Sequence, residues 1–301
     1  MIATLLLLLQ QSASVVMLGT GTPNPDPERS GPAVAVVVNG TAYLVDAGAG
    51  VMRRAAAAAA RHQLEGLRAR RIGTVFLTHL HSDHTIGLPD VIHTGWVAER
   101  EAPLRLIGPP GTAAMAAHLT EAYRADIANR TTGLQPHTVD GWRVDASDVA
   151  AAGVVYQDSN VVVTAVPVPH DGWEYAYGYR FQTRDMVVVI SGDTRPSQAI
   201  IDACDGCDIL VHEVYSTEGF ARRPPDWQAY HADAHTSSAE LATIAGRARP
   251  RLLVLYHQLH MGTADEDLVR EIREAGYGGP VVSARDLDRY PDRATFPEPR
   301  P

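Results

Sequence analysis

Cysteine is scarce in this chain. Only two occur, Cys204 and Cys207 in the stretch CDGC. A lone C-x-x-C is compatible with a redox pair, with half of a zinc site or with two small buried residues. No second pair exists that could complete a four-sulfur zinc site. We therefore favour two small buried residues over either reactive role.

An excess of basic residues is also missing. The chain has 26 basic and 35 acidic side chains, which gives a formal charge of -9. It therefore lacks the overall positive field that attracts proteins to nucleic acid, although a local basic patch would not show in this sum. Long apolar runs are absent too. The longest one, near the N-terminus, is too short to span a membrane as a stable anchor.

The N-terminus combines the apolar stretch from Ile2 to Leu9 with the small polar residues that follow it. This order resembles a signal peptide, and the first plausible core strand, Val15 to Leu18, begins only afterwards. No Lys or Arg precedes the apolar stretch, which counts against that interpretation. We predict a signal peptide over residues 1–14, one hydrolase domain over 15–301, and a periplasmic or secreted location. An extra N-terminal strand or a misassigned start codon are the alternatives, and without cleavage the location would be cytoplasmic.

The remaining chain has the composition of a folded protein. It comprises 301 residues, 45% hydrophobic and 20% charged, enough for one large domain or two small ones. Asn39-Gly40 between two apolar runs indicates a β-hairpin. Helices are expected over Met52 to Arg71, from near Thr112, near Ser197 to Cys204 and over Asp265 to Glu274. Strands dominate each half, which favours two packed sheets with helices outside them.

The stretch THLHSDHTIGLPD follows the apolar run from Ile72 to Leu77 and places His79, His81, Asp83 and His84 within six positions. Imidazole nitrogen and carboxylate oxygen are ligands that Zn²⁺ and related metals favour. Alternate residues of an extended segment share a side, so the first three can point together while His84 begins the next turn. This spacing favours ligands that are divided between two metals.

The same four residues form an intact H-x-H-x-D-H motif, and from about Val15 to Ala284 the chain resembles the metallo-β-lactamase superfamily. It is most similar to the ribonuclease Z and arylsulfatase-like branch. The matching stretches are LGTGTPNPDPERSGPA, HTIGLPD, IGPPGT, GYRF, SGDTRP, LVHEVYST and AHTSSAELATIA. The resemblance implies an α/β (α+β) fold, an αββα sandwich of two mixed β-sheets flanked by helices.

The resemblance also implies a centre of two metals, which we expect to be Zn²⁺, with Mn²⁺ or Fe as alternatives. Its ligands would be His79, His81 and His170 for the first metal, Asp83, His84 and His257 for the second, and Asp193 between them. His170, Asp193 and His257 each follow an apolar strand. Strand ends at one edge of a sheet can converge, so the residues themselves agree with this ligand set.

Catalytic roles follow from the resemblance in the same way. His235 matches the position that protonates the leaving group, Glu213 matches the acid that orients it, and Asp83 is counted as catalytic as well as a ligand. We expect Asp46 to hold a ligand histidine rather than to bind metal itself. His212 precedes Glu213 on a strand and should point the other way.

The substrate is where this chain departs from ribonuclease Z. That family ends its final ligand motif with a Ser and an Arg-Tyr pair, whereas the corresponding run here is YHQLHMG. No long basic arm for gripping transfer RNA is visible between Ile107 and His170, and Lys and Arg contacts to phosphate dominate such affinity. We therefore expect hydrolysis of a small anionic ester, a phosphodiester or aryl sulfate, by metal-bound hydroxide, with His235 as the proton donor. Nucleic acid is the less favoured partner, and a homodimer is a further expectation.

Other functions remain open. One alternative is a transfer RNA 3′-processing endonuclease of the ribonuclease Z type. Another is a lactonase or β-lactamase-like enzyme, although Asp83 argues against a β-lactamase. A non-enzymatic binding protein is disfavoured by the complete ligand set. Trp173, Tyr175 and Tyr177 alternate along one strand and would either pack in the core or form a stacking wall for substrate.

Overall fold

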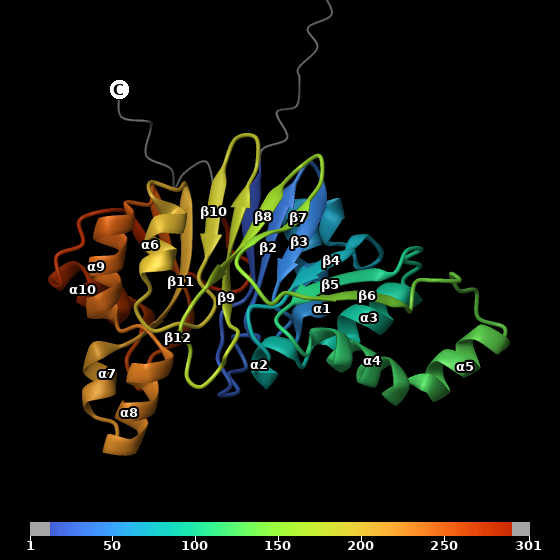
Figure 1. The fold of residues 1–301 in the computed structure, drawn as a ribbon, viewed down its shortest axis with the longest axis horizontal. Helices are drawn as coiled ribbons and strands as arrows, with labels where there is room; N and C mark the ends of the chain where they lie inside the picture. The colour runs from blue at the N-terminus through green and yellow to red at the C-terminus, as the bar shows by residue number, and fades with distance from the viewer. Residues whose placement is uncertain (1–12, 291–301) are drawn as a thin grey trace, which may run out of the picture.

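Two seven-stranded sheets face each other in the computed structural model, which describes residues 13–290 (Figure 1). The first sheet consists, in spatial order, of β14 (Arg289–Tyr290), β1 (Ser14–Gly19), β2 (Ala33–Val38), β3 (Thr41–Val45), β4 (Thr74–Phe76), β5 (Leu104–Gly108) and β6 (Val144–Asp148). The second consists of β13 (Val281–Ser283), β12 (Leu252–Leu259), β11 (Ile209–Tyr215), β10 (Val187–Ile190), β9 (Tyr177–Gln182), β8 (Val162–Pro167) and β7 (Gly153–Gln157). Both sheets mix parallel and antiparallel pairs.

Helices cover the outer faces of both sheets. Those on the side of the first sheet are α1 (Val51–His62), η1 (Glu65–Leu67), η2 (Ala69–Arg71), α3 (Leu88–Val97), α4 (Thr112–Ala122) and α5 (Arg124–Thr132). Those on the second are α6 (Gln198–Cys204), α9 (Ser238–Ala248) and α10 (Asp265–Glu274). Three short helices lie at the lower end of the sandwich in Figure 1: α2 (Ser82–Thr85), α7 (Thr217–Ala221) and α8 (Pro225–Ala234). The expected αββα sandwich is confirmed.

Aromatic rings fill the centre between the two sheets. Phe76 from β4 packs against Tyr179 and Phe181 from β9, with ring centroids 5.3 Å and 5.6 Å apart. All three side chains are buried. Burial of a side chain such as Phe contributes about 1.5–3 kcal/mol, so this contact holds the first sheet to the second. The end of β4 is thereby fixed one residue before the segment that leads into the histidine motif.

Several local expectations are confirmed. The hairpin at Asn39-Gly40 joins β2 and β3 with Val38 opposite Thr41, and both turn residues have positive φ, as such two-residue turns require. The helix over Asp265–Glu274 has the expected bounds. The helix expected over Met52 to Arg71 is shorter, because Gln63 adopts a left-handed conformation that ends α1 and two 3₁₀ turns follow.

The signal-peptide prediction falls almost wholly outside the described residues. Ser14, placed at the end of that segment, is the first residue of β1 and is buried. Among residues 13–290, no helix has the length and apolar character needed to cross a membrane. Cys204 and Cys207 are buried as expected, but they are joined by a disulfide between the end of α6 and the start of β11 rather than being two free thiols.

Candidate metal centre

The histidine motif lies where β4 leads into α2. His81 has an extended backbone (φ -60°, ψ 149°), and α2 begins at the next residue. His79 and His81 therefore point to the same side, as strand alternation predicted, and His79 Nε2 lies 2.9 Å from His81 Nδ1. His84 sits on the first turn of α2 and is fully buried.

His170 completes a three-histidine cluster with His79 and His81. It comes from the loop after β8, and its Nε2 atom lies 3.2 Å from His81 Nδ1. Its other ring nitrogen, Nδ1, donates to the carbonyl oxygen of Ala234 at 2.7 Å. One nitrogen from each ring falls in a group whose atoms all lie within 4.8 Å of one another. These three rings can hold one metal ion.

A second cluster lies beside the first and contains Asp83, His84 and His257. His257 Nε2 is 3.2 Å from Asp83 Oδ2, and His84 Nε2 is 3.5 Å from the same oxygen. Asp193, which follows β10, lies between the two clusters: its Oδ2 atom is 3.3 Å from His84 Nε2 and 3.4 Å from His257 Nε2. It also forms a group with His79 and His84. This carboxylate would be able to contact an ion in either cluster.

Asp46 orients His84 from behind, which is the kind of contact expected for it. Its Oδ2 atom accepts a hydrogen bond from His84 Nδ1 at 2.8 Å, and its Oδ1 atom accepts from the backbone N–H of Thr78 at 2.8 Å. Asp46 is buried and has a left-handed backbone (φ 64°). The hydrogen bond leaves His84 Nε2 free to face the cluster, as outer partners of metal-binding histidines do.

The donor set of the two clusters fits metal cations. Two atoms that face the clusters, His84 Nε2 and Asp193 Oδ1, are buried without hydrogen-bond partners among the described residues. Burial lowers the pKa of His79 and of His170, so both rings are neutral near pH 7, the form that binds metal. Buried polar atoms without a partner are costly unless a cation joins them. The structure therefore contains His/Asp clusters able to bind metal.

His235 and Glu213 form the next layer. His235 Nδ1 lies 3.4 Å from Glu213 Oε2 and 3.9 Å from Asp193 Oδ2. The other oxygen of Glu213 accepts from the backbone N–H of Thr236 at 2.8 Å. Burial raises the pKa of Glu213 well above its usual value and lowers that of His235 to about 4. The geometry brings together both residues that the resemblance named.

The remaining candidate residues lie either at the rim of the site or in the interior of the protein. His212 is buried, and its Nδ1 atom donates to the carbonyl oxygen of Glu213, so it takes no part in the described clusters. Trp173 lies at the rim of the site, where its indole N–H donates to His81 Nε2 at 3.0 Å. Tyr177, four residues further along at the start of β9, is buried in the core instead. Trp173 and Tyr175 precede β9 and pack against the hydrophobic cores, so packing accounts for this aromatic run, and a stacking role toward substrate stays a prediction.

The sequence did not reveal the part of the site formed by α8. Tyr230 on this helix lies edge-on to His235, with ring centroids 6.1 Å apart. Burial raises the pKa of Tyr230, and so do the nearby carboxylates of Asp171, Asp193 and Asp83. The spacing of Trp227, Tyr230 and His231 is a signal that could have found this face, because residues three and four apart share one side of a helix.

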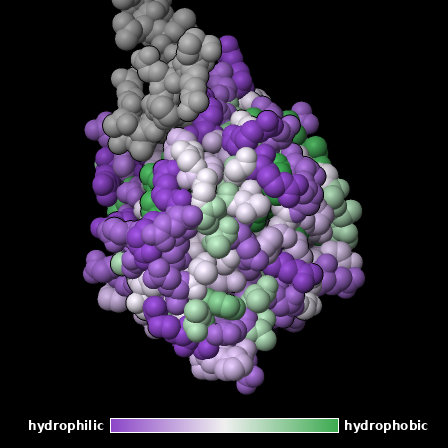
Figure 2. Space-filling model, turned by 90° about the vertical axis from the view of Figure 1, so that its left-hand side faces the viewer, coloured by the Kyte–Doolittle hydropathy of each residue, from purple (hydrophilic) through white to green (hydrophobic). Residues whose placement is uncertain are grey.

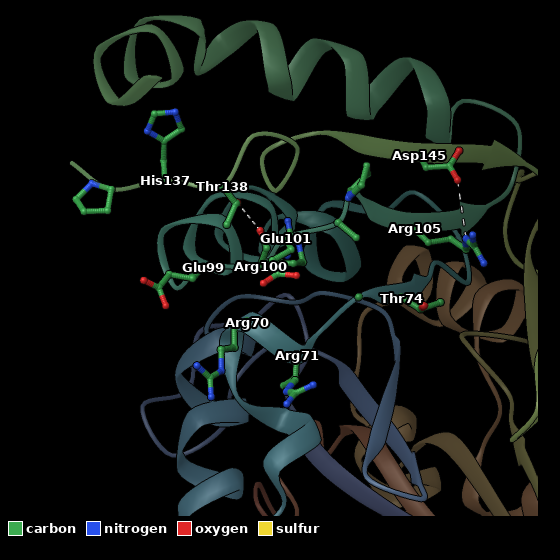
Figure 3. Close-up of a pocket in the computed structure, with 14 residues that line it drawn as sticks. Arg70, Arg71, Thr74, Glu99, Arg100, Glu101, Arg105, His137, Thr138 and Asp145 are labelled. Carbon is green, nitrogen blue, oxygen red and sulfur yellow. Dashed lines mark hydrogen bonds and ion pairs between the residues drawn. The ribbon is translucent and has the colours of Figure 1, made fainter. Parts of the chain in front are cut away.

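A groove of about 430 Å³ adjoins the second cluster at Asp83 and runs between the loop of residues 22–31 and Ile86. A larger cavity, about 980 Å³, lies elsewhere, at the beginnings of β4 and β5 (Figure 3). Its wall includes Arg70, Arg71 and Arg105, the last 3.9 Å from Asp145. Parallel strands β4 and β5 run from that cavity toward the histidine motif, so cavity and clusters lie at opposite ends of these strands.

Comparison with known proteins agrees with this site. The family model described as "Beta-lactamase superfamily domain" matches residues 41–258. Ribonuclease Z of Mycobacterium bovis (strain BCG / Pasteur 1173P2) is 34% identical over 281 residues, covering 91% of this chain and 96% of its own. Ribonuclease Z of Mycobacterium marinum is also 34% identical, covering 91% and 97%.

Solved structures show the same fold. The short form of human tRNase Z superimposes with a TM-score of 0.68 at 21% identity, covering 92% of this chain and 98% of that one. A metallo-beta-lactamase fold protein from Bacillus subtilis, YhfI, gives a TM-score of 0.68 at 17% identity, covering 92% and 98%.

The chain belongs to the beta-lactamase superfamily and is a metal-dependent hydrolase that acts on ester bonds. The relatives that match it over nearly its whole length carry the name Ribonuclease Z.

These relatives correct our expectation about the partner. A small anionic ester as the main substrate is wrong, because proteins matched over 91% of the chain are named for a ribonuclease. The aryl sulfate gains no support either. The net charge of -9 did not exclude a nucleic acid substrate, because it is a sum over the whole chain and does not describe the groups around the clusters.

Proposed function

We propose that the protein is an endonuclease of the ribonuclease Z type, which cleaves a phosphodiester bond near the 3′ end of precursor transfer RNA. The observation that carries this proposal is the 34% identity to a ribonuclease Z over 91% of the chain. The two His/Asp clusters support it, because they offer every side chain that a two-metal centre for phosphodiester hydrolysis needs.

We infer that two Zn²⁺ ions occupy the clusters, with Mn²⁺ or Fe as alternatives. The side chains that would hold them are His79, His81 and His170, then Asp83, His84 and His257, with Asp193 contacting both. Ions held this way supply an activated water and offset the charge of a phosphodiester. The carboxylates of Asp83 and Asp193 partly balance the two positive ions.

The residues around the clusters would supply the proton. His235 forms a group with Asp193 and His257, and its ring centroid lies 5.5 Å from that of His170. We infer that it protonates the departing oxygen of the RNA. Glu213 would orient the ring through the contact at Nδ1. Because His235 is almost fully buried, bulk water has little access to this proton. A positioned histidine acid contributes about 10²- to 10⁴-fold to a rate.

Cleavage of an unmodified precursor transfer RNA with a 3′ trailer tests the proposal. Zinc-loaded protein should release the trailer at one position, and His79→Ala should abolish that release by removing one ligand. His62→Ala is a suitable control, because His62 lies far from the clusters at the end of α1 and contacts the carbonyl oxygen of Leu287. Absence of specific cutting, in a preparation that hydrolyses bis(p-nitrophenyl) phosphate, would overturn the proposal and leave the hydrolase class intact.

A further inference from the structure

The segment that joins Glu213 to His235 forms a short helical hairpin, α7 and α8. Glu213 lies near the end of β11, and His235 directly follows the last residue of α8. In Figure 1 the two helices project from the same end of the sandwich as α2, below the second sheet. Any substrate that reaches His235 must therefore pass close to this hairpin.

One side of α8 carries a row of aromatic rings that leads to His235. Trp227, Tyr230 and His231 are three and four residues apart, the spacing of one helical face. The Trp227 ring stacks on His231 with centroids 5.6 Å apart and meets Tyr230 edge-on at 5.9 Å. His231 and Tyr230 in turn lie 5.7 Å and 6.1 Å from His235. The row runs without a break from the surface to the metal centre.

Core packing does not explain this row. Neither Trp227 nor Tyr230 belongs to any of the three hydrophobic cores of residues 13–290. Trp227 is 49% exposed, which is unusual for so large a ring. The hydroxyl of Tyr230 has no hydrogen-bond partner among the described residues, although carboxylates lie nearby. The side of the molecule that carries α7 to α10 is mostly hydrophilic, with scattered small apolar groups (Figure 2).

A guanidinium group accompanies the rings. Arg223 lies in the turn between α7 and α8, and its Cζ atom is 5.5 Å from the centroid of the Trp227 ring. Its side chain forms no hydrogen bond or ion pair within residues 13–290, and its Nε atom is buried without a partner. Aromatic rings beside an arginine that has no carboxylate partner are the combination that binds single-stranded nucleic acid, where bases stack and the cation contacts phosphate.

We propose that α7 and α8 form the nucleotide-binding platform of this enzyme, in which Trp227 and Tyr230 stack bases next to the scissile bond and Arg223 binds a backbone phosphate. The inference rests on the proposed function, because RNA is taken as the substrate. It adds a specific occupant, a single-stranded stretch of RNA, and specific residues outside the metal clusters.

Binding of a fluorescently labelled single-stranded RNA of 12 nucleotides, about the length one such surface can hold, tests the proposal. Zinc-loaded protein in a His235→Ala background keeps the RNA intact, and anisotropy gives the Kd. Trp227→Ala should raise the Kd about 10-fold, the expected effect of one lost base stack. Trp227→Phe, which keeps an aromatic face, should recover most of the affinity.

Two further variants sharpen the measurement. Trp142→Ala is the matched control, because Trp142 lies beside β6 and stacks with Arg143 in another part of the molecule; its Kd should equal that of the parent. Arg223→Gln should weaken binding. The slope of log Kd against log salt should fall by about 1, the change expected when one phosphate contact is lost. Equal affinity of Trp227→Ala and its parent, or no binding by the parent, would overturn the proposal.

The kinetic comparison separates this inference from the proposed function. Trp227→Ala in the otherwise unaltered enzyme should lose about 10-fold more activity on precursor transfer RNA than on bis(p-nitrophenyl) phosphate, a single phosphodiester with no nucleotide chain to extend along α8 from His235 to Trp227. Equal losses of activity on the two substrates would mean that Trp227 only supports the local structure. A change of oligomeric state in sedimentation would assign the rings to a subunit contact. Either result would contradict the nucleotide-binding platform. Binding that depends on Trp227 without cleavage of precursor transfer RNA would refute the proposed function alone.

Discussion

His235 Nδ1 lies 3.4 Å from Glu213 Oε2, and both side chains are almost fully buried behind the metal clusters. Neither atom has a hydrogen-bond partner within the described residues. Two buried polar atoms at this distance are costly to leave apart, so a small movement into hydrogen-bond contact is favoured. The pair is therefore poised to fix the ring of His235.

His235→Ala should reduce turnover far more than metal content. The ring lies at the edge of the clusters, while seven other side chains remain to hold the ions. We expect kcat to fall about 10²- to 10⁴-fold. The zinc content of the purified variant, measured by elemental mass spectrometry, should stay unchanged within error. His62→Ala, which removes a ring at the end of α1 outside both the clusters and the α8 row, is the control. A parallel loss of zinc would show that His235 is a ligand instead.

Asp46→Ala should weaken metal binding without removing a candidate ligand. The substitution deletes the acceptor of His84 Nδ1 and leaves the buried N–H of Thr78 without its partner. Loss of such an outer partner typically costs about 10- to 100-fold in metal affinity. Competition with a fluorescent zinc chelator measures the change. An unaltered affinity would mean that packing alone holds the ring of His84.

Asp265→Asn should lower stability in a pH-dependent way. Burial alone would raise the pKa of Asp265, but His260 and Arg29 outweigh it and lower that pKa to about 2. The Arg29 guanidinium contacts both carboxylate oxygens at 2.7 Å. A depressed pKa stabilises the fold above the unfolded value of about 3.9 and loses that effect as the pH falls towards 2.

At pH 7 we expect Asp265→Asn to lower the free energy of unfolding by about 2 kcal/mol. Urea titrations with a chelator present measure it, and the difference from the unaltered protein should shrink at pH 3. Asp145→Asn, which removes an exposed partner of Arg105, should have no measurable effect at either pH. A difference that stays constant with pH would show that hydrogen bonding rather than charge stabilises this contact.

Zinc should raise the melting temperature of the chelator-treated protein in a concentration-dependent way. An ion that binds only the folded chain stabilises it by about 4 kcal/mol at a concentration one thousand times its Kd. His257→Ala should lessen the rise, since it removes a ligand from the second cluster, whereas His62→Ala should leave it intact. A melting temperature that does not respond to zinc would contradict the metal centre itself.

Local chemistry made much of the fold predictable. The pair Asn39-Gly40 predicts the hairpin turn because few other residues accept a positive φ at both positions. The helix over Asp265–Glu274 could be located because acidic residues occupy its first turn and its apolar residues recur on one face. Gln63 was missed as the end of α1, because a left-handed helix end is usually marked by Gly or Asn and Gln gives no such signal.

The candidate site could likewise be predicted from the sequence only in part. His79 and His81 could be paired from alternation alone, because they are two residues apart in an extended segment. Bringing His170 and His257 to them depended on the resemblance, since no local rule joins residues so distant in sequence. Tyr230 was missed because α8 begins at the second residue of a Pro-Pro pair, which looks like a loop in the sequence, and only the packed structure turns the Tyr230 ring toward His235.

The seven candidate ligands come from both halves of the chain. His79, His81, Asp83 and His84 follow the first sheet, whereas His170, Asp193 and His257 follow strands of the second. During synthesis the first group leaves the ribosome long before β12 and His257 exist. A nascent chain would thus hold three histidines and one aspartate without their partners. The second cluster can therefore be complete only after β12 and His257 are in place.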